Sequence, residues 1–306
     1  MKTAWLFPGQ ASQKVGMGKD LFDQTDLGRQ YFERANEIMG CDIQTIIFHG
    51  PKDTLKQTRY TQPSIYIVSV ILGELLKGKG VAPNAVAGHS LGEYSALAVA
   101  NAFDFETGLS LVKVRADSMA KAGEIQEGTM AAIIGMGDEA VTDLCSGYSE
   151  NGVVVAANFN SPGQVVISGS PDAVTAVMAS ARESGARIAV QLNVSGAFHS
   201  PLMTPAREAL AEMLDSLEIS DTLYPVFTNV DAKPVTQGND IKNSLIRQLE
   251  NPVLWTKSIF SMKELGIESF VEVGPGKVLQ GLNKRMDRKT LSQGVESLEQ
   301  VENFNV

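Results

Sequence analysis

A serine between two glycines is the strongest chemical signal in this chain. The stretch Gly88-His89-Ser90-Leu91-Gly92 has the form G-x-S-x-G, follows a short apolar run over 85–87 and precedes residues with good helix propensity. A strand that turns sharply into a helix at a serine places the hydroxyl on an exposed corner, and the two glycines permit that turn without a Cβ clash. Ser90 is therefore a candidate nucleophile, although a glycine-rich turn with a helix-capping serine would have the same pattern.

A serine nucleophile needs a base within hydrogen-bond reach, and histidine is the usual base at neutral pH. The chain has three histidines. We interpret His89, beside Ser90, as structural support because neighbouring side chains diverge in a tight turn, and His49 as a surface or capping residue. His199 lies in a glycine-containing loop over 195–201 and is the base that position favours. No acidic residue follows the pattern of a catalytic triad, so we expect a dyad in which a backbone carbonyl orients the imidazole.

One arginine falls on the apolar side of a helix predicted over about 106–122. At about 100° per residue, the apolar residues of this helix share one side: Leu109, Leu111, Val112, Ala116 and Met119. Arg115 falls between Leu111 and Met119, where a charged guanidinium needs an anion to offset the cost of desolvation. That anion is either a buried Asp or Glu of the chain itself or the carboxylate of a substrate held by a bidentate clamp.

The order of the predicted elements indicates an α/β fold with a hydrolase-like, parallel-sheet core. Buried strands over 3–7, 85–87, 224–230 and 269–273 are separated by helical stretches that include 31–39, 62–77 and 106–122. Such alternation implies a parallel sheet with helices on its faces. The polar tail beyond Asp287 is expected to be frayed.

An insertion with a different pattern interrupts this core. Strands are predicted over 129–135, 153–157, 164–168 and 187–194, and helices over 138–144 and 171–184. The order β-α-β-β-α-β is the signature of a ferredoxin-like subdomain. We therefore predict a discontinuous catalytic domain over 1–126 and 195–306 and a ferredoxin-like βαββαβ subdomain over 127–194.

Composition excludes several classes of protein. A formal net charge of −9 over 306 residues argues against nucleic acid as a partner. The two cysteines, Cys41 and Cys145, form neither a disulfide framework nor a metal-ligand spacing, which suits the cytoplasm. The longest apolar stretch, over 64–72, is far shorter than the roughly 20 residues of a membrane span, so no membrane partner is expected. No signal peptide is expected, because the apolar run that ends at Phe7 is cut by Pro8 and is too short for one.

Several motifs, taken together and in order, resemble the malonyl-coenzyme A:acyl carrier protein transacylases. This family includes the enzyme of fatty-acid synthesis and the acyltransferases of polyketide synthases. The resemblance covers nearly the whole chain and rests on Phe7-Pro8-Gly9-Gln10, Gly88-His89-Ser90-Leu91-Gly92-Glu93-Tyr94-Ser95-Ala96-Leu97, Arg115, Asn158-Phe159-Asn160-Ser161-Pro162-Gly163-Gln164, Phe198-His199-Ser200, Arg247-Gln248-Leu249, Asn251-Pro252-Val253 and Glu272-Val273-Gly274-Pro275-Gly276.

The resemblance implies a reaction and its partners. Ser90 would attack the thioester of malonyl-coenzyme A, with His199 as base and then as acid. The malonyl-serine ester would then pass to the phosphopantetheine thiol of an acyl carrier protein. Arg115 would hold the free malonyl carboxylate. Coenzyme A would be part of the substrate, and neither a resident cofactor nor a metal is expected.

The resemblance also implies roles for the residues around this pair. The backbone amides of Gln10 and Leu91 would form the oxyanion hole, and the backbone carbonyl of Gln248 would orient the catalytic histidine. Phe198 resembles the malonyl-selective pattern, in which a bulky ring fills the space that an α-methyl branch needs; simple core packing is the alternative interpretation. Ala11 departs from the family, which commonly has glycine there, and slightly constrains the loop beside the oxyanion hole.

Other functions on the same scaffold remain open at this point. An editing hydrolase that cleaves acyl groups from carriers would be expected to lack the arginine, and Arg115 tells against it. A non-catalytic carrier-binding module would not need Ser90 and His199 together. The sequence is compatible with both fatty-acid and polyketide synthesis, and nothing in it demands more than a monomer.

Overall fold

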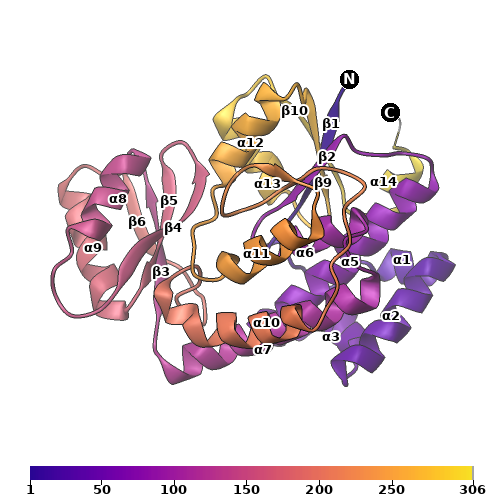
Figure 1. The fold of residues 1–306 in the computed structure, drawn as a ribbon, viewed down its shortest axis with the longest axis horizontal. Coiled ribbons are helices and arrows are strands. Elements are labelled where there is room, and N and C mark those ends of the chain that lie inside the picture. Colours follow the sequence, from indigo (N-terminus) through magenta and orange to yellow (C-terminus); the bar gives the residue numbers. More distant parts are fainter. Residues whose placement is uncertain (305–306) are drawn as a thin grey trace.

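A six-stranded sheet forms the centre of the larger part of the molecule. The computed structural model describes residues 1–304, and Figure 1 shows this sheet surrounded by helices. Its strand order is β10-β9-β1-β2-β7-β8, and every neighbouring pair is parallel except β7 and β8, which are antiparallel. The strands are β1 (Thr3–Phe7), β2 (Ala85–Gly88), β7 (Val226–Phe227), β8 (Pro234–Val235), β9 (Ser269–Val273) and β10 (Leu291–Val295). The predicted α/β class with a parallel core is confirmed, with one antiparallel strand added at an edge.

Helices cover both faces of this sheet because its central strands are apolar on both faces. In β1, Trp5 and Phe7 pack into one core cluster, whereas Ala4 and Leu6 pack into another. Alternate residues of a strand point to opposite faces, so each cluster belongs to one face. The first face is covered by α5 (Thr58–Gly78), α6 (Gly92–Val99) and α7 (Phe105–Ile125), and the second by α12 (Trp255–Glu264) and α13 (Val278–Met286).

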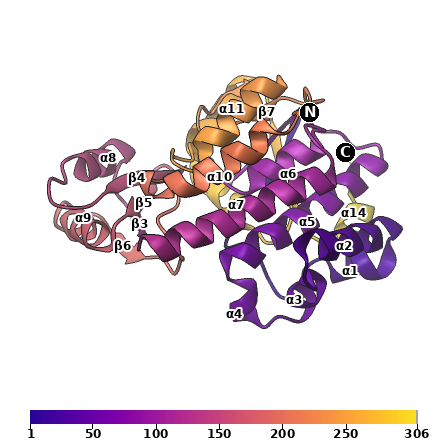
Figure 2. The same ribbon diagram turned by 60° about the horizontal axis from the view of Figure 1, so that its bottom comes forward.

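The remaining helices of the larger part pack outside this first layer. Figure 2 shows the long helix α7 running from the main body toward the second sheet. It packs against α5 on one side and α10 on the other. The outer helices are α1 (Lys19–Gln24), α2 (Asp26–Met39), α3 (Ile43–His49), α4 (Lys52–Leu55), the 3-10 turn η1 (Pro201–Met203), α10 (Thr204–Asp215), α11 (Gly238–Gln248) and α14 (Leu298–Glu302). None of the helices within residues 1–304 has the length and apolar character needed to cross a bilayer.

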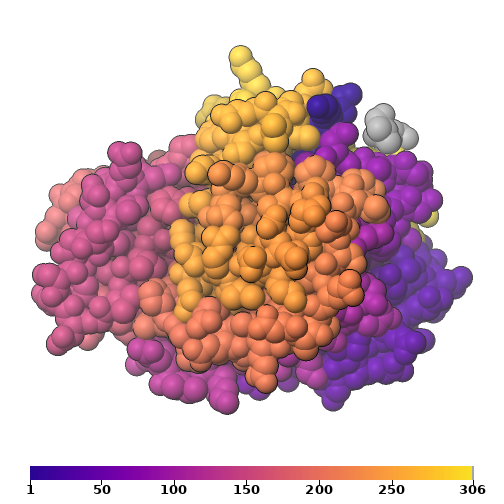
Figure 3. All heavy atoms as spheres, in the orientation of Figure 1, coloured from indigo at the N-terminus to yellow at the C-terminus, as the bar shows by residue number. Residues whose placement is uncertain are grey.

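A second, four-stranded sheet forms a lobe beside the main body, at the left of Figures 1 and 3. Its elements are β3 (Thr129–Ile134), α8 (Asp138–Ser146), β4 (Val154–Ser161), β5 (Gln164–Gly169), α9 (Pro171–Glu183) and β6 (Ile188–Gln191). The sheet order is β4-β5-β3-β6 and all neighbours are antiparallel. The predicted β-α-β-β-α-β order is therefore confirmed, whereas the exact domain limits at 127 and 194 stay a prediction.

The two faces of this small sheet have different neighbours. Ala131 and Ile133 of β3 pack against α8 and α9 in a core of their own. Met130 and Ala132 point the other way, into the cluster of the larger part. One face of the sheet therefore packs against its own helices, and the other face packs against the larger part of the molecule.

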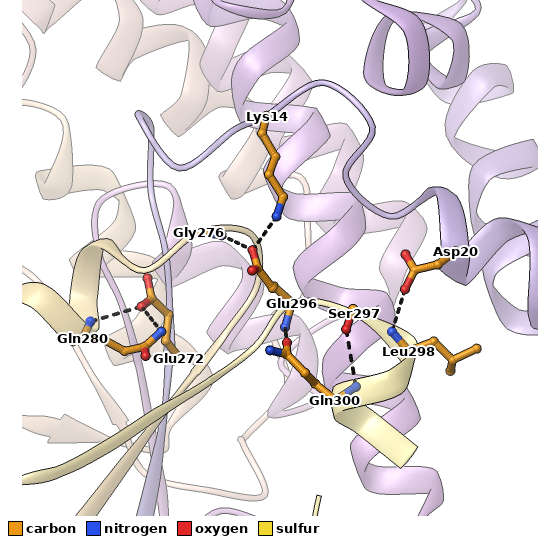
Figure 4. Close-up of polar contacts among 9 residues, drawn as sticks. All are labelled: Lys14, Asp20, Glu272, Gly276, Gln280, Glu296, Ser297, Leu298 and Gln300. Atoms are coloured by element: carbon orange, nitrogen blue, oxygen red, sulfur yellow. Dashed lines mark hydrogen bonds and ion pairs between the residues drawn. The ribbon is translucent and has the colours of Figure 1, made fainter. Parts of the chain in front are cut away.

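The C-terminal segment is ordered, so the prediction of a frayed tail was wrong as far as residue 304; residues 305 and 306 lie outside the described chain. β10 pairs with β9 along its whole length, and α14 follows it. Glu296 accepts hydrogen bonds from Lys14 Nζ at 2.7 Å and from the amide of Gly276 at 3.0 Å, as Figure 4 shows. An edge strand needs only partial burial, and its polar sequence was therefore mistaken for a solvated tail.

Three other strands differ in length from their predictions. The segment over 224–230 contributes only the two residues of β7, and β6 is shorter than the predicted 187–194. β4 instead continues to Ser161, beyond the predicted end of this strand at residue 157. Apolar runs mark buried chain, whereas the backbone partners that define a strand come from segments distant in the sequence.

Candidate active site

The G-x-S-x-G stretch forms a sharp turn between β2, which ends at Gly88, and α6, which begins at Gly92. Ser90 has φ 51°, a left-handed conformation that is unusual for a residue with a side chain. A Cβ on Gly88 would lie 1.8 Å from the carbonyl carbon of Gly92, and a Cβ on Gly92 would lie 2.0 Å from the carbonyl oxygen of Phe7. Both glycines are therefore required by close backbone approach, and the turn aims Ser90 into a cavity of about 1120 Å³.

The structure brings Ser90 and His199 together from positions 109 residues apart. Ser90 Oγ lies 2.8 Å from Nε2 of His199, whose Nδ1 lies 2.9 Å from the carbonyl oxygen of Gln248 and 3.2 Å from that of Asn251. Because both partners of Nδ1 are acceptors, Nδ1 carries the proton and Nε2 is free to accept the serine proton. The carbonyl of Gln248 is the one that the family resemblance implied, and the carbonyl of Asn251 is an additional partner.

Burial keeps this histidine neutral. Burial and, to a lesser degree, the positive charge of Arg115 lower the pKa of His199 to about 3, against the two carbonyl hydrogen bonds that raise it. The imidazole is therefore an unprotonated base at neutral pH. Its geometry and protonation state both suit removal of a proton from Ser90.

Arg115 is completely buried and its guanidinium faces the same serine. Nη2 donates to Ser90 Oγ at 3.0 Å and to Gln248 Oε1 at 3.0 Å, and Nη1 donates to Gln62 Oε1 at 2.6 Å. The guanidinium carbon also lies 5.4 Å from the centre of the Tyr94 ring. Every polar partner in these contacts is neutral.

The internal salt bridge considered from the sequence is absent. Among residues 1–304, no carboxylate oxygen lies within 4.0 Å of a side-chain nitrogen of Arg115. A buried cation without a close anion is electrostatically suited to a ligand carboxylate. Gln62, which holds one arm of the guanidinium, was not identified from the sequence; a single amide within the apolar face of α5 was the available signal.

Gln10 and Leu91 place two main-chain amides at the edge of the cavity. Within the described chain, neither amide donates a hydrogen bond to a protein acceptor. Unpaired donors beside a nucleophile could stabilise an oxyanion. Next to them is Ala11, at the position where the family commonly has glycine. Its φ of 86° is a left-handed conformation, which is unusual for a residue with a side chain.

The turn is also held by Asn229, which lies within the segment predicted as a strand over 224–230 and was not predicted as a site residue. Its Oδ1 accepts from the amide of Ser90 at 2.7 Å, and its Nδ2 donates to the carbonyl of Gly88 at 2.7 Å. These two bonds satisfy the amide of the nucleophile itself and the carbonyl of the residue two positions before it. The signal in the sequence was a polar residue close to the end of a buried strand.

Glu93 is a second residue whose part in the site the sequence did not indicate. It is 2 % exposed, and its Oε2 accepts from Gln248 Nε2 at 2.7 Å and from the amide of Asn229 at 3.2 Å. Burial, with a smaller contribution from the charge of Asp231, raises the pKa of Glu93 to about 7. The two hydrogen bonds and the positive charge of Arg115 oppose it.

The raised pKa of Glu93 predicts a pH-dependent contribution to stability. The folded protein holds this proton more tightly than the unfolded chain, where the carboxyl titrates near its ordinary value of 4.5. The contribution is therefore present below that value and is lost as pH rises through about 7. Relative to Glu93→Gln, the wild type should become less stable between about pH 5 and pH 8, as measured by urea denaturation. His199 is present in both proteins, so its titration cancels from the difference in their free energies of unfolding. If that difference did not change with pH, the prediction would be contradicted.

Within residues 1–304, neither of the other two histidines forms a side-chain hydrogen bond with Ser90 or His199. His89 Nε2 is 2.7 Å from Asn160 Oδ1, and its ring packs against Trp255 with the centroids 5.4 Å apart. His49 is exposed at the end of α3.

Phe198 lines the cavity beside His199 and is 6 % exposed. In the part of the chain with described coordinates, no group of three or more His, Cys, Asp or Glu side chains is arranged to hold a metal ion.

Comparison with known proteins finds relatives along nearly the whole chain. The sequence profile described as "Acyl transferase domain" matches residues 4–302. The malonyl CoA-acyl carrier protein transacylase of Bacillus subtilis is 42% identical over 302 residues, which is 98% of this chain and 95% of that protein. The protein of the same name from Synechocystis sp. is 45% identical over 285 residues, or 93% of this chain and 94% of that protein.

Solved structures show the same likeness in three dimensions. An acyl carrier protein S-malonyltransferase from Vibrio cholerae superimposes with a TM-score of 0.95 at 42% identity, covering 99% of both chains. A malonyl-transacylase in complex with a type II polyketide-synthase acyl-carrier protein gives a TM-score of 0.93 at 38% identity, covering 99% of this chain and 98% of that one. Because the acyltransferase profile and these relatives both match almost its full length, the chain belongs to the malonyl CoA-acyl carrier protein transacylase family.

Proposed function

We propose that this protein transfers a malonyl group from coenzyme A to the phosphopantetheine thiol of an acyl carrier protein, through a malonyl-serine intermediate. The observation that carries the proposal is the buried guanidinium of Arg115, which has no carboxylate oxygen of residues 1–304 within 4.0 Å and lies 3.0 Å from the oxygen of Ser90. A substrate bearing a carboxylate close to its reacting carbonyl fits this arrangement. The relatives' names and the carrier-bound neighbour support the same reaction.

Each half of the reaction follows from the positions of the groups. Ser90 Oγ attacks the malonyl thioester carbon while its proton passes to Nε2 of His199. The amides of Gln10 and Leu91 hold the oxyanion of the tetrahedral intermediate. Collapse breaks the carbon–sulfur bond, and the proton from His199 leaves with the coenzyme A thiol.

The second half-reaction reverses these steps with a different thiol. The phosphopantetheine thiol gives its proton to His199 and attacks the serine ester. The carbon–oxygen bond to Ser90 breaks, and the serine recovers its proton from His199. The malonylated carrier is the product, a precursor for fatty-acid or polyketide chain extension.

The alternative of an editing hydrolase is less well supported by the same site. A hydrolase of simple acyl groups has no use for Arg115 beside its nucleophile. The small sheet also places apolar side chains, Met130, Ala132 and Val166, in the wall of the cavity. These side chains limit the water near the serine ester and favour its survival until a thiol arrives.

Intact mass spectrometry tests the proposal directly. After mixing with malonyl-coenzyme A, the protein should gain the mass of one malonyl group on Ser90, and the adduct should persist for minutes. Adding a phosphopantetheinylated carrier should remove the adduct and place it on the carrier. Rapid release to water without carrier malonylation would favour the hydrolase, and no adduct at all would refute the proposal.

Phe198 is proposed to select malonyl over methylmalonyl groups. Its ring is buried in the cavity wall next to the base, where an α-methyl branch would need space. Malonyl-coenzyme A should acylate Ser90 about tenfold faster or more than methylmalonyl-coenzyme A, since one misplaced methyl costs about 1–3 kcal/mol. Stopped-flow or quenched-flow acylation rates measure the ratio. Equal rates for the two substrates would assign Phe198 to core packing alone.

A further inference from the structure

Glu93 contacts two residues that support the active site, Gln248 and Asn229, but does not itself line the cavity. It lies three residues after Ser90, at the start of α6, and its carboxylate is buried. Through Oε2 it binds the side chain of Gln248 and the main chain of Asn229. The proposed reaction assigns it no step, yet a buried carboxylate is costly to maintain without a compensating role.

The side chain of Gln248 has a defined direction because of this contact. Both hydrogens of Nε2 are used, one toward Glu93 Oε2 at 2.7 Å and one toward the carbonyl of Ser90 at 3.0 Å. Oε1 therefore faces Arg115 Nη2, from which it accepts at 3.0 Å. A reversed amide would set donor against donor at Arg115 and acceptor against acceptor at Glu93.

Gln248 also connects Glu93 to the proposed base, His199. Its main-chain carbonyl accepts from His199 Nδ1 at 2.9 Å, while its side chain accepts from Arg115. Movement of this one residue would therefore shift the guanidinium and the imidazole together. Its side chain is held from outside the cavity by Glu93 and the Ser90 carbonyl.

We propose that Glu93 is a positioning residue for the carboxylate clamp, acting on Arg115 through the side-chain amide of Gln248. This inference rests on the proposed function, because it concerns recognition of the malonyl carboxylate. What Glu93 supplies is an acceptor oxygen at a fixed place. A glutamine at position 93 can supply the same acceptor, whereas an apolar side chain of similar length cannot.

Comparison of Glu93→Met with Glu93→Gln tests this role. Glu93→Met should lower the ratio of kcat/KM for malonyl-coenzyme A to that for acetyl-coenzyme A by about tenfold, mainly through KM for the malonyl substrate, because a hydrogen bond that supports a charged group is lost. Glu93→Gln should restore most of the ratio. Equal losses with both substrates, or no rescue by glutamine, would show that Glu93 has only a structural role.

Glu272→Met is the matched control. Glu272 is also a buried glutamate, and it accepts from the amides of Leu279 and Gln280 at 3.0 Å instead of from Gln248 or Asn229; Figure 4 shows Glu272 and Gln280. Its loss should lower thermal stability and leave the malonyl-to-acetyl ratio unchanged. A fall in the ratio as large as that in Glu93→Met would overturn the inference.

A second variant keeps the inference testable if Glu93→Met does not fold. Gln248→Met removes the amide and keeps the main-chain carbonyl for His199, so it must lower the same ratio, and adding Glu93→Gln to it must cause no further fall. An unchanged ratio in Gln248→Met would overturn the inference. These outcomes are separable from failure of the proposed function, in which the wild type itself would form no malonyl-enzyme.

Discussion

Ser90→Ala is expected to form no malonyl-enzyme and to lose turnover by on the order of 10⁴-fold or more, because no other group in the site can carry the acyl chain. Substrate binding should survive, since Gln62 and Gln248 still hold the Arg115 guanidinium and the oxyanion amides belong to the main chain. Intact mass spectrometry reports the adduct, and a coupled assay of released coenzyme A reports turnover.

Ser95→Ala provides a matched control on the same helix. Ser95 is completely buried, and its hydroxyl has no hydrogen-bond partner within residues 1–304. Removing that oxygen should leave acylation within about twofold of the wild type, because no bond is lost. Substantial malonylation of Ser90→Ala would mean that another residue is the nucleophile.

Arg115→Ala is expected to lower acylation by malonyl-coenzyme A by about 10²-fold or more, while acylation by acetyl-coenzyme A stays constant or rises. Loss of one partner of a buried, hydrogen-bonded charge pair costs about 2–5 kcal/mol, which corresponds to this range. Only the malonyl substrate has a carboxylate to pair with the guanidinium. Competition between the two thioesters, read by mass spectrometry of the acyl-enzyme, measures the change in preference.

Arg115→Lys separates charge from geometry. Lysine keeps a positive charge but cannot bind Gln62, Gln248 and a carboxylate with one rigid planar fork. Its preference for malonyl should therefore lie between those of the wild type and the alanine variant. If Arg115→Ala retained the wild-type preference, the arginine would be a structural residue and the carboxylate would be recognised elsewhere.

The sequence by itself determined the chemical types and much of the fold. The spacing of Gly88, Ser90 and Gly92 identified the turn, and the structure shows that added Cβ atoms would collide with backbone at both glycines. Periodicity identified the strands β1 and β9 with their observed limits and the order of the inserted elements. These features are local, because each depends on residues close together in the chain.

Only the tertiary structure decided what partners those residues have. The sequence left Arg115 with two possible anions, and the fold surrounds it with the neutral side chains of Gln62 and Gln248 and the hydroxyl of Ser90. These groups come from 25 to 133 residues away. Glu93 stood inside the predicted motif, yet its contact with Gln248 spans 155 residues. Local patterns carry no information about such pairings, which arise when helices and strands from the whole chain pack around one turn.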